Sequence, residues 1–222
     1  MNCLLCDTPI LPKETFSSIL LMQSKKVYIC EECQTRFERI KNPHCPTCCK
    51  SGIKKTCQDC LYWQDKGQEV CHRALFTYND MMKDYFSRYK FQGDYLLRKV
   101  FSDAVKSALK NYPGYTIVPI PLSADSLQKR KFNQVTGFLE DASIAYCPLL
   151  KIKEKNKVSQ SSKTREERLA TQQFFTFNEE EKIPDKVLLV DDIYTTGATL
   201  MLARQILCEK GVKIINTFSL AR

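Results

Sequence analysis

Apolar residues recur with two different periods along the second half of the chain, and these periods predict alternating strands and helices. Met81, Tyr85 and Tyr89 recur every four residues, which is typical of one face of a helix over 79–90. We interpret this aromatic stripe as core rather than as a base-stacking platform. The same reasoning predicts helices over 96–109 and from about 198, and strands over 74–78, 116–120, 187–190 and 213–220.

The segment 187–220 carries the most structural information. Four β-favouring apolar residues at 187–190 indicate a strand that is buried on both faces, as in a parallel sheet. Two aspartates and a turn rich in threonine and glycine follow, and then a helical pattern that ends at Gly211. A second strand completes a right-handed βαβ unit. The pattern therefore predicts an α/β fold with a parallel sheet flanked by helices.

Composition removes several classes of protein. The chain has 222 residues, of which 43% are apolar and 27% charged, with seven glycines and nine prolines, so collagen-like and wholly disordered chains are excluded. No apolar stretch is long enough to span a membrane as a helix. Cys3 and Cys6 stand where a secretory signal would place its charged and apolar regions. We therefore expect a cytoplasmic protein.

The twelve cysteines are distributed unevenly. Ten lie between Cys3 and Cys71, and only Cys147 and Cys208 occur later. This change in composition predicts a metal-binding domain over 1–73 and an α/β domain over 74–222. In a reducing compartment such a cluster indicates metal ligation rather than disulfides.

Eight of these cysteines form four Cys-x-x-Cys pairs, which predict two structural four-sulfur Zn²⁺ sites without an open position for water. Joining the pairs in sequence order produces two zinc ribbons. An interleaved pairing, first with third and second with fourth, remains open. Cys49, Cys71, His44 and His72 are further candidate ligands, although a spare buried thiol or a surface histidine is the simpler interpretation of each. The predicted metal ligands are Cys3, Cys6, Cys30, Cys33, Cys45, Cys48, Cys57 and Cys60.

The metal sites change the charge argument. Thirty-four basic minus twenty-five acidic residues leave a formal charge of +9. Eight thiolates against two divalent ions contribute −4, which lowers the effective charge to about +5. The basic excess alone is therefore weak support for nucleic-acid binding.

The turn after 187–190 predicts a phosphate site. Backbone N–H groups at a helix N-terminus, where the helix dipole favours an anion, converge from Thr195, Thr196, Gly197, Ala198 and Thr199. Asp191 and Asp192 stand just before them and can accept hydrogen bonds from neighbouring hydroxyls, so a sugar phosphate with a vicinal diol fits. The chain contains no Walker loop and is not expected to be its own ATP-driven motor.

The sequence VLLVDDIYTTGAT at 187–199 resembles the phosphoribosyl pyrophosphate (PRPP) signature of type I phosphoribosyltransferases. With the paired cysteines, KFQGD at 90–94, VPIPL at 118–122 and RKFNQ at 130–134, the order of motifs over nearly the whole chain resembles the ComF family. The resemblance implies a double zinc ribbon before a type I phosphoribosyltransferase-like sheet. It also implies a competence role in uptake of transforming single-stranded DNA, as adaptor of a cytoplasmic ComFA-like ATP-dependent DNA translocase.

The same resemblance implies residue roles. Asp191 and Asp192 would hold the ribose hydroxyls, and 195–199 the 5′-phosphate. A Mg²⁺ ion would bridge pyrophosphate and ribose oxygens. The pyrophosphate loop and the flexible loop that closes over PRPP would include Pro121, Leu122, Ser123, Lys129, Arg130, Gln160 and Arg168.

Three departures from the family pattern limit this transfer. Lys131 replaces a usual glycine, so the turn either does not need a positive φ or tolerates strain. An asparagine expected soon after Arg168 is missing from 169–171. The chain ends at Arg222 without a C-terminal hood, so no acceptor pocket and no catalytic base are identified. An adaptor with a phosphoribosyl ligand is the favoured function, and an active phosphoribosyltransferase with an unidentified acceptor or a non-catalytic PRPP sensor are the alternatives.

A basic run suggests the nucleic-acid surface. Lys151, Lys153, Lys155 and Lys157 alternate, so an extended chain would present them on one side about 6.6–6.8 Å apart. A solvated loop is the simpler interpretation. Together with the basic residues at 129–131 and 165–168, the run predicts weak, salt-dependent, sequence-indifferent binding of single-stranded DNA.

Overall fold

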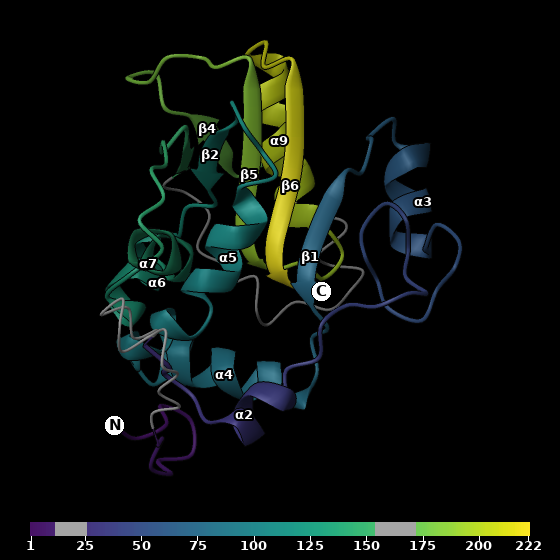
Figure 1. The fold of residues 1–222 in the computed structure, drawn as a ribbon. Helices are drawn as coiled ribbons and strands as arrows, with labels where there is room; N and C mark the ends of the chain where they lie inside the picture. Colours follow the sequence, from purple (N-terminus) through teal and green to yellow (C-terminus); the bar gives the residue numbers. More distant parts are fainter. Residues whose placement is uncertain (12–25, 154–171) are drawn as a thin grey trace.

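Four parallel strands form the central sheet of the computed structural model, which describes residues 1–11, 26–153 and 172–222. All three neighbouring pairs are parallel, so the carboxyl ends of the strands share one edge (Figure 1). This arrangement confirms the predicted α/β class. In spatial order the strands are β1 (His72–Phe76), β6 (Ile214–Ala221), β5 (Lys186–Ile193) and β2 (Thr116–Pro119).

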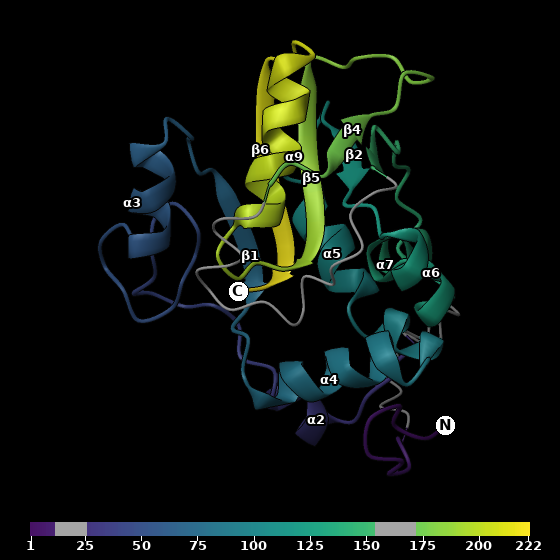
Figure 2. The same cartoon turned by 180° about the vertical axis from the view of Figure 1, so that it is seen from behind.

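Helices cover both faces of this sheet. Helix α9 (Ala198–Glu209) lies on one face, and α5 (Ser102–Leu109) and α7 (Gln134–Asp141) lie on the other (Figures 1 and 2). The remaining elements are α2 (Glu31–Thr35), α3 (Gln58–Asp65), α4 (Asp80–Phe91), the 3₁₀ helix η1 (Tyr95–Val100), α6 (Ala124–Arg130), and the antiparallel strands β3 (Leu150–Ile152) and β4 (Phe175–Phe177).

The apolar run in β5 is explained by two separate cores. Leu188 and Val190 belong to the core that contains α4, α5 and α7. Val187 and Leu189 point to the opposite face and belong to the core beneath α9. Because alternate strand residues face opposite layers, both faces must be apolar, which is the pattern that predicted a doubly covered strand.

The predicted helix over 96–109 is two helices. A 3₁₀ helix ends at Val100 and α5 begins at Ser102, with Phe101 between them at φ −114° and ψ 2°, outside helical geometry. The Phe101 ring packs edge-on against Phe37 and Tyr85, with ring centroids 4.8 and 4.9 Å away. Tertiary packing of this one aromatic side chain therefore accompanies a break that helical periodicity did not indicate.

The aromatic stripe of α4 is core, as predicted. Tyr85 and Tyr89 have no exposed surface. Their hydroxyls donate to the backbone oxygens of Leu97, at 3.1 Å, and of Gln134, at 3.0 Å. Both rings therefore bury their area without leaving a polar atom unsatisfied, and neither face is available to stack on a base.

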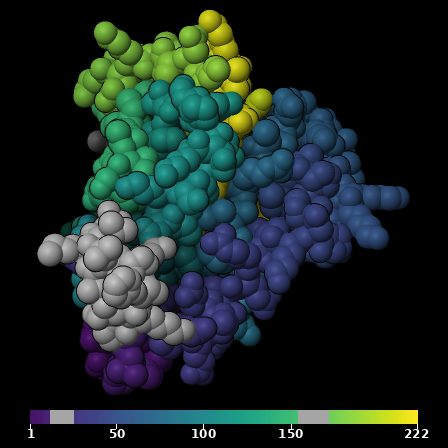
Figure 3. Space-filling model, in the orientation of Figure 1, coloured from purple at the N-terminus to yellow at the C-terminus, as the bar shows by residue number. Residues whose placement is uncertain are grey.

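The cysteine-rich head packs against the body in two places and shares its cores. Phe37 lies in the core of α4 and α5, and Trp63 lies in the core beneath α9. Figure 3 shows the head, in blue, spread along the side and base of the body. Strand β1 crosses the boundary predicted at residue 73, and this division into domains stays a prediction. Within the described ranges, no helix combines the length and apolarity needed to cross a membrane.

Candidate metal centres and sheet-edge loop

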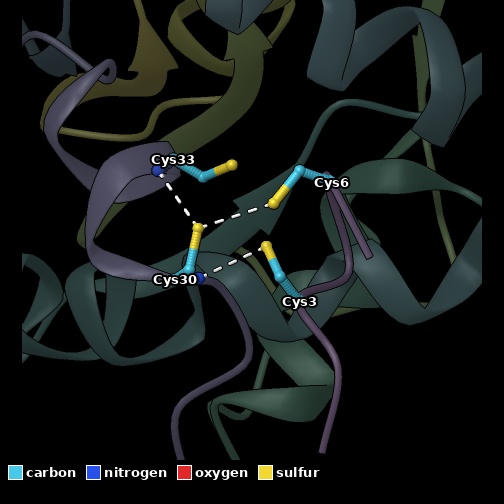
Figure 4. Close-up of side chains that lie close together, drawn as sticks. All are labelled: Cys3, Cys6, Cys30 and Cys33. Atoms are coloured by element: carbon cyan, nitrogen blue, oxygen red, sulfur yellow. Dashed lines mark hydrogen bonds between the residues drawn. The ribbon is translucent and has the colours of Figure 1, made fainter. Parts of the chain in front are cut away.

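The first cysteine cluster joins the N-terminal turn to helix α2. Cys3 and Cys6 come from the turn, Cys30 caps α2, and Cys33 lies within that helix. The four sulfur atoms face a common centre (Figure 4). Arg88 of α4 donates hydrogen bonds to the backbone carbonyls of Leu4 and Leu5 in this turn, at 2.7 and 2.8 Å. These bonds hold the first cluster against the body.

The second cluster is fully buried and lies beside the sheet edge. Cys45 and Cys48 come from a loop, Cys57 caps α3, and Cys60 lies in its first turn. All four side chains belong to the core beneath α9. The second cluster is therefore part of the body, although its residues come from the head.

Both clusters have the dimensions of a tetrahedral four-sulfur site. Within each, the ligand atoms all lie within 4.8 Å of one another. Neighbouring sulfurs are 3.5 Å apart for Cys6 and Cys30, and 3.6 Å for Cys48 and Cys57. A tetrahedron with Zn–S bonds of about 2.3 Å has edges of about 3.8 Å, whereas a disulfide needs about 2.05 Å. The geometry confirms pairing in sequence order, and the interleaved arrangement is wrong.

The other candidate ligands lie outside both clusters. His72 is buried, and its ring nitrogens bond the hydroxyls of Thr217 and Ser219 at 2.9 and 3.0 Å. Cys49 is buried within 3.6 Å of the His72 carbonyl oxygen, and Cys71 is exposed. Of these three residues, only Cys49 is the spare buried thiol that the sequence suggested, because His72 is a buried rather than a surface histidine and Cys71 is an exposed thiol.

The thiols of the second cluster cannot all ionise without a cation. Hydrogen bonds from Cys48 and Cys60 hold the pKa of Cys57 far below its ordinary value. Hydrogen bonding to Cys48 and Cys57 raises the pKa of Cys60 far above it. Four thiolates in one buried space repel each other, and a divalent cation is a partner that suits this donor set.

The predicted phosphate site is a loop at the carboxyl end of β5. We call residues 194–199 the threonine-rich loop. Strand β5 continues to Ile193, three residues beyond the prediction, and Gly197 caps α9 with φ +84°. Part of the loop lines a small hollow together with Asp191, Ile193 and Leu200. The chain thus brings Asp191 and the predicted cradle residues together.

The two aspartates have different surroundings. As consecutive strand residues they point to opposite faces, and only Asp191 lines the hollow. Burial and the negative charge of Asp192 raise the pKa of Asp191 to about 7. Asp192 is 5% exposed and is paired with Lys90 Nζ at 2.7 Å. A single diol gripped by both carboxylates, as the sequence suggested, is therefore not the arrangement described by this structure.

Three motifs that are distant in sequence meet at Asp192. Gln134 Nε2 donates to Asp192 Oδ2 at 2.5 Å, and Arg130 Nη1 donates to Gln134 Oε1 at 2.9 Å. Lys90 supplies the cation from the end of α4. The sequence motifs that contain Lys90 and Gln134 do not by themselves assign these residues to the site. The signal that points to them is that each motif places a charged or amide side chain within reach of a carboxylate.

The remaining predicted residues occupy the same edge or lie outside the described ranges. Pro121 and Leu122 follow β2, and Ser123 caps α6 by accepting from the Ser126 N–H at 3.2 Å. Lys129 stands in the last turn of α6. Lys131 has φ +66°, so the turn does need the conformation that glycine favours and tolerates the strain. Gln160, Arg168, Lys155 and Lys157 are outside the described residues.

The first prediction concerns Gly197. A Cβ built at Gly197 would clash with Tyr194 Oη, and the residue has φ +84°, whereas Gly114 has φ +77° and open space around it. We expect Gly197→Ala to lower the free energy of unfolding by about 1–3 kcal/mol more than Gly114→Ala, because only the first adds a clash. Urea unfolding of both variants measures the difference. Equal losses would contradict the close approach of Tyr194.

The second prediction concerns pH. The folded-state pKa of Asp191 lies above its ordinary 3.8, so its contribution to stability is complete below about pH 4 and lost as the pH rises through about 7. We expect the wild type to lose on the order of a few kcal/mol relative to Asp191→Asn between about pH 4.5 and about pH 8. Urea titrations at both pH values test this.

The matched control is Asp185→Asn. Lys213 lies 2.9 Å from Asp185 and lowers the pKa of that carboxyl, so its contribution has the opposite sign and is lost as the pH falls. A wild type whose stability relative to Asp191→Asn did not change with pH would contradict the raised pKa.

No protein-family model matches the chain. Competence protein ComFC of Streptococcus pneumoniae (strain ATCC BAA-255 / R6) is 48% identical over 222 residues, covering 100% of both chains. Competence protein ComFC of Bacillus subtilis (strain 168) is 33% identical over 230 residues, covering 99% of this chain and 94% of the relative.

A solved hypoxanthine phosphoribosyltransferase from Staphylococcus aureus matches 56% of this chain and 63% of its own, with a TM-score of 0.32 and 15% identity. A structural similarity this low supports no conclusion about the chain.

The fold and the clusters define a class of protein: an α/β protein with one parallel sheet and two four-cysteine clusters that could each hold a metal ion. Identity over the full length then places the chain within that class. It belongs to the ComFC family of competence proteins.

Proposed function

We propose that this chain acts in the uptake of transforming single-stranded DNA, as the cytoplasmic partner of a ComFA-like ATP-dependent DNA translocase, and that its threonine-rich loop binds PRPP. Its ComFC relatives support the competence role. The observation that supports the ligand is that Lys90, Gln134 and Arg130 meet at Asp192, directly after Asp191, which lines the hollow together with the threonine-rich loop. Mixed cationic and carboxylate side chains beside free backbone N–H groups suit a phosphorylated sugar.

In this proposal each group has its own task. The loop N–H groups bind the 5′-phosphate, and Asp191 accepts hydrogen bonds from the ribose hydroxyls. Arg130 and the turn at 121–123 face the pyrophosphate. Mg²⁺, when bound with PRPP, neutralises the pyrophosphate charge. Asp192 holds Lys90 and Gln134 in place.

The test is calorimetric titration of PRPP in the presence of Mg²⁺. We expect the wild type to bind and Asp191→Asn to bind at least about tenfold more weakly, because one charged acceptor is lost. The single variant is preferred to a change at both aspartates, since Asp192 is also part of a buried ion pair. No binding by the wild type would refute the PRPP site.

The alternatives differ in what happens to bound PRPP. An active phosphoribosyltransferase releases pyrophosphate when its acceptor is supplied, whereas a sensor binds PRPP and releases none with any base. A pyrophosphate-release assay across nucleobases separates them. Release with a base would replace the adaptor proposal by the enzymatic one.

We propose Zn²⁺ as the ion in both clusters, because it accepts four thiolates in tetrahedral geometry without redox chemistry. Elemental analysis is expected to return about two zinc ions per chain. One ion or none would contradict the two-site assignment.

The DNA surface is proposed on the basic residues at 129–131 and Lys153. Lys151 contributes less than its sequence pattern suggested, because Glu180 lies 3.0 Å from it. Anisotropy titrations with single-stranded DNA are expected to show weaker binding as salt rises from about 50 to about 300 mM. Equal affinity at both concentrations would exclude an electrostatic mode of binding.

The head is the proposed docking surface for the translocase. Deleting it would expose Phe37 and Trp63, which belong to the shared cores, so a surface change is the better test. Leu61 on α3 is 47% exposed and Leu127 on α6 is 46% exposed. We expect Leu61→Glu to reduce pull-down of the purified translocase and Leu127→Glu to leave it unchanged. The reverse result would move the docking surface to the body.

A further inference from the structure

Two side chains connect the second cluster directly to the threonine-rich loop. Arg222 Nη2 lies 3.4 Å from Cys48 Sγ and 3.9 Å from Cys57 Sγ, while its Nη1 donates to the backbone oxygen of Thr195. Trp63, three residues after Cys60 on α3, donates its indole N–H to the backbone oxygen of Thr196 at 2.8 Å. The backbone carbonyls of Thr195 and Thr196 therefore both accept hydrogen bonds from side chains that lie beside the second cluster.

The Arg222 side chain that makes these contacts is itself buried. The Arg222 side chain is 7% exposed and also reaches Asp59 Oδ2 at 3.3 Å. Its guanidinium stacks over the Tyr194 ring at 4.7 Å, and the His72 ring stacks on Tyr194 with centroids 4.1 Å apart. A planar fork with five donors can bond a sulfur and a carbonyl at once, which a lysine cannot do.

The direction of the carbonyls decides the direction of the next N–H groups. In a planar trans peptide, C=O and N–H point to opposite sides. Holding the Thr195 and Thr196 carbonyls toward the cluster turns the N–H groups of Thr196 and Gly197 away from it. Among the described residues, neither N–H takes part in a backbone hydrogen bond. Both stay available at the start of α9.

We propose that the second cysteine cluster positions the threonine-rich loop through Arg222 and Trp63, so that metal occupancy of the cluster and anion binding on the loop are thermodynamically coupled. Arg222 and Trp63 are positioning residues in this scheme. The effect on anion binding rests on the proposed PRPP site. The effect of the cluster on the position of the loop does not depend on any ligand of the loop. By linkage, each event must change the other by the same factor.

The chain carries its own fluorescent reporter for the coupling between the second cluster and the loop. Trp63 is the single tryptophan, and it lies between the second cluster and the loop. Its fluorescence during removal of zinc by an excess of chelator follows the second cluster rather than the first. We expect Gly197→Ala, which displaces the loop, to accelerate this signal by about fivefold or more relative to Gly114→Ala. Equal rates in the two variants overturn the proposal, whatever PRPP does.

The effect on anion binding is tested with Arg222→Lys in the zinc-loaded full chain. This variant keeps the charge and loses the fork, so we expect two bound zinc ions, as in the wild type, but PRPP binding weaker by about tenfold. Conversely, Mg²⁺ and PRPP are expected to slow chelator-induced release in the wild type and not in Arg222→Lys. Unchanged PRPP affinity in Arg222→Lys overturns the role of Arg222.

The outcomes keep the two proposals apart. A wild type that binds no PRPP but shows faster release in Gly197→Ala refutes the PRPP site and supports the mechanical coupling. A wild type that binds PRPP with no effect on zinc release refutes the coupling and leaves the PRPP site standing.

Discussion

Cys60→Ser is expected to remove one of two metal ions per chain and to unfold the region around α3. Cys60 has no exposed surface and supplies one of four sulfurs. A complete four-ligand zinc site contributes on the order of 10 kcal/mol of folding free energy, and whole domains are stable by only about 5–15 kcal/mol. The free energy of folding lost with one thiolate of a buried site is therefore expected to be a large fraction of the total stability. Elemental analysis and thermal unfolding followed by circular dichroism measure both effects.

The controls for Cys60→Ser are other cysteines. Cys71 and Cys208 are exposed and lie outside both clusters, so their serine variants are expected to keep two ions and the wild-type melting temperature. Cys33→Ser, in the first cluster, should also lose one ion, because the two sites have separate ligands. Two ions in Cys60→Ser, or a loss of metal in Cys71→Ser, would contradict the ligand assignment.

Asp192→Ala is expected to lower the free energy of unfolding by about 3–5 kcal/mol. The Lys90 and Asp192 side chains are 12% and 7% exposed, and 2.7 Å separates their charged atoms. Removing the carboxylate leaves an ammonium group in a buried place and leaves Gln134 Nε2 without its acceptor. Urea unfolding at neutral pH measures the loss.

The matched control for Asp192→Ala is Asp185→Ala. Asp185 and Lys213 are 2.9 Å apart, but both side chains are 74% exposed, and solvent-exposed pairs of this kind contribute little to stability, so Asp185→Ala is expected to cost far less than Asp192→Ala. The double variant Lys90→Met with Asp192→Ala should lose less than the sum of its single changes, since no unpaired charge remains. Equal costs for the Asp192 and Asp185 variants would contradict the buried ion pair.

Most of the cysteine chemistry was readable in the sequence, and the pairing was not. A Cys-x-x-Cys spacing places two thiolates at one turn, which is a local property of the chain. Which turn meets which depends on contacts such as that of Arg88 with the N-terminal turn and that of Trp63 with the sheet edge. Those contacts join residues 83 and 133 positions apart.

The site shows the same division. Strand, turn and helix over 187–199 follow from local pattern, and Gly197 has the positive φ that such a turn requires. The different surroundings of Asp191 and Asp192 follow from the continuation of β5 to Ile193, because strand geometry then sends the two side chains to opposite faces. The apolar pattern ended at 190 and carried no sign of this extension.

By itself, the sequence determined the α/β class, the eight cysteines that form the two clusters, the core role of the aromatic helix and the position of the threonine-rich loop. These are local matters, since period, spacing and turn chemistry act over a few residues. Only the tertiary structure decided that Lys90 pairs with Asp192 and that Arg222 joins the second cluster to the loop. Such contacts depend on how separate elements pack, and distant residues meet only when the whole sheet and both cores are assembled.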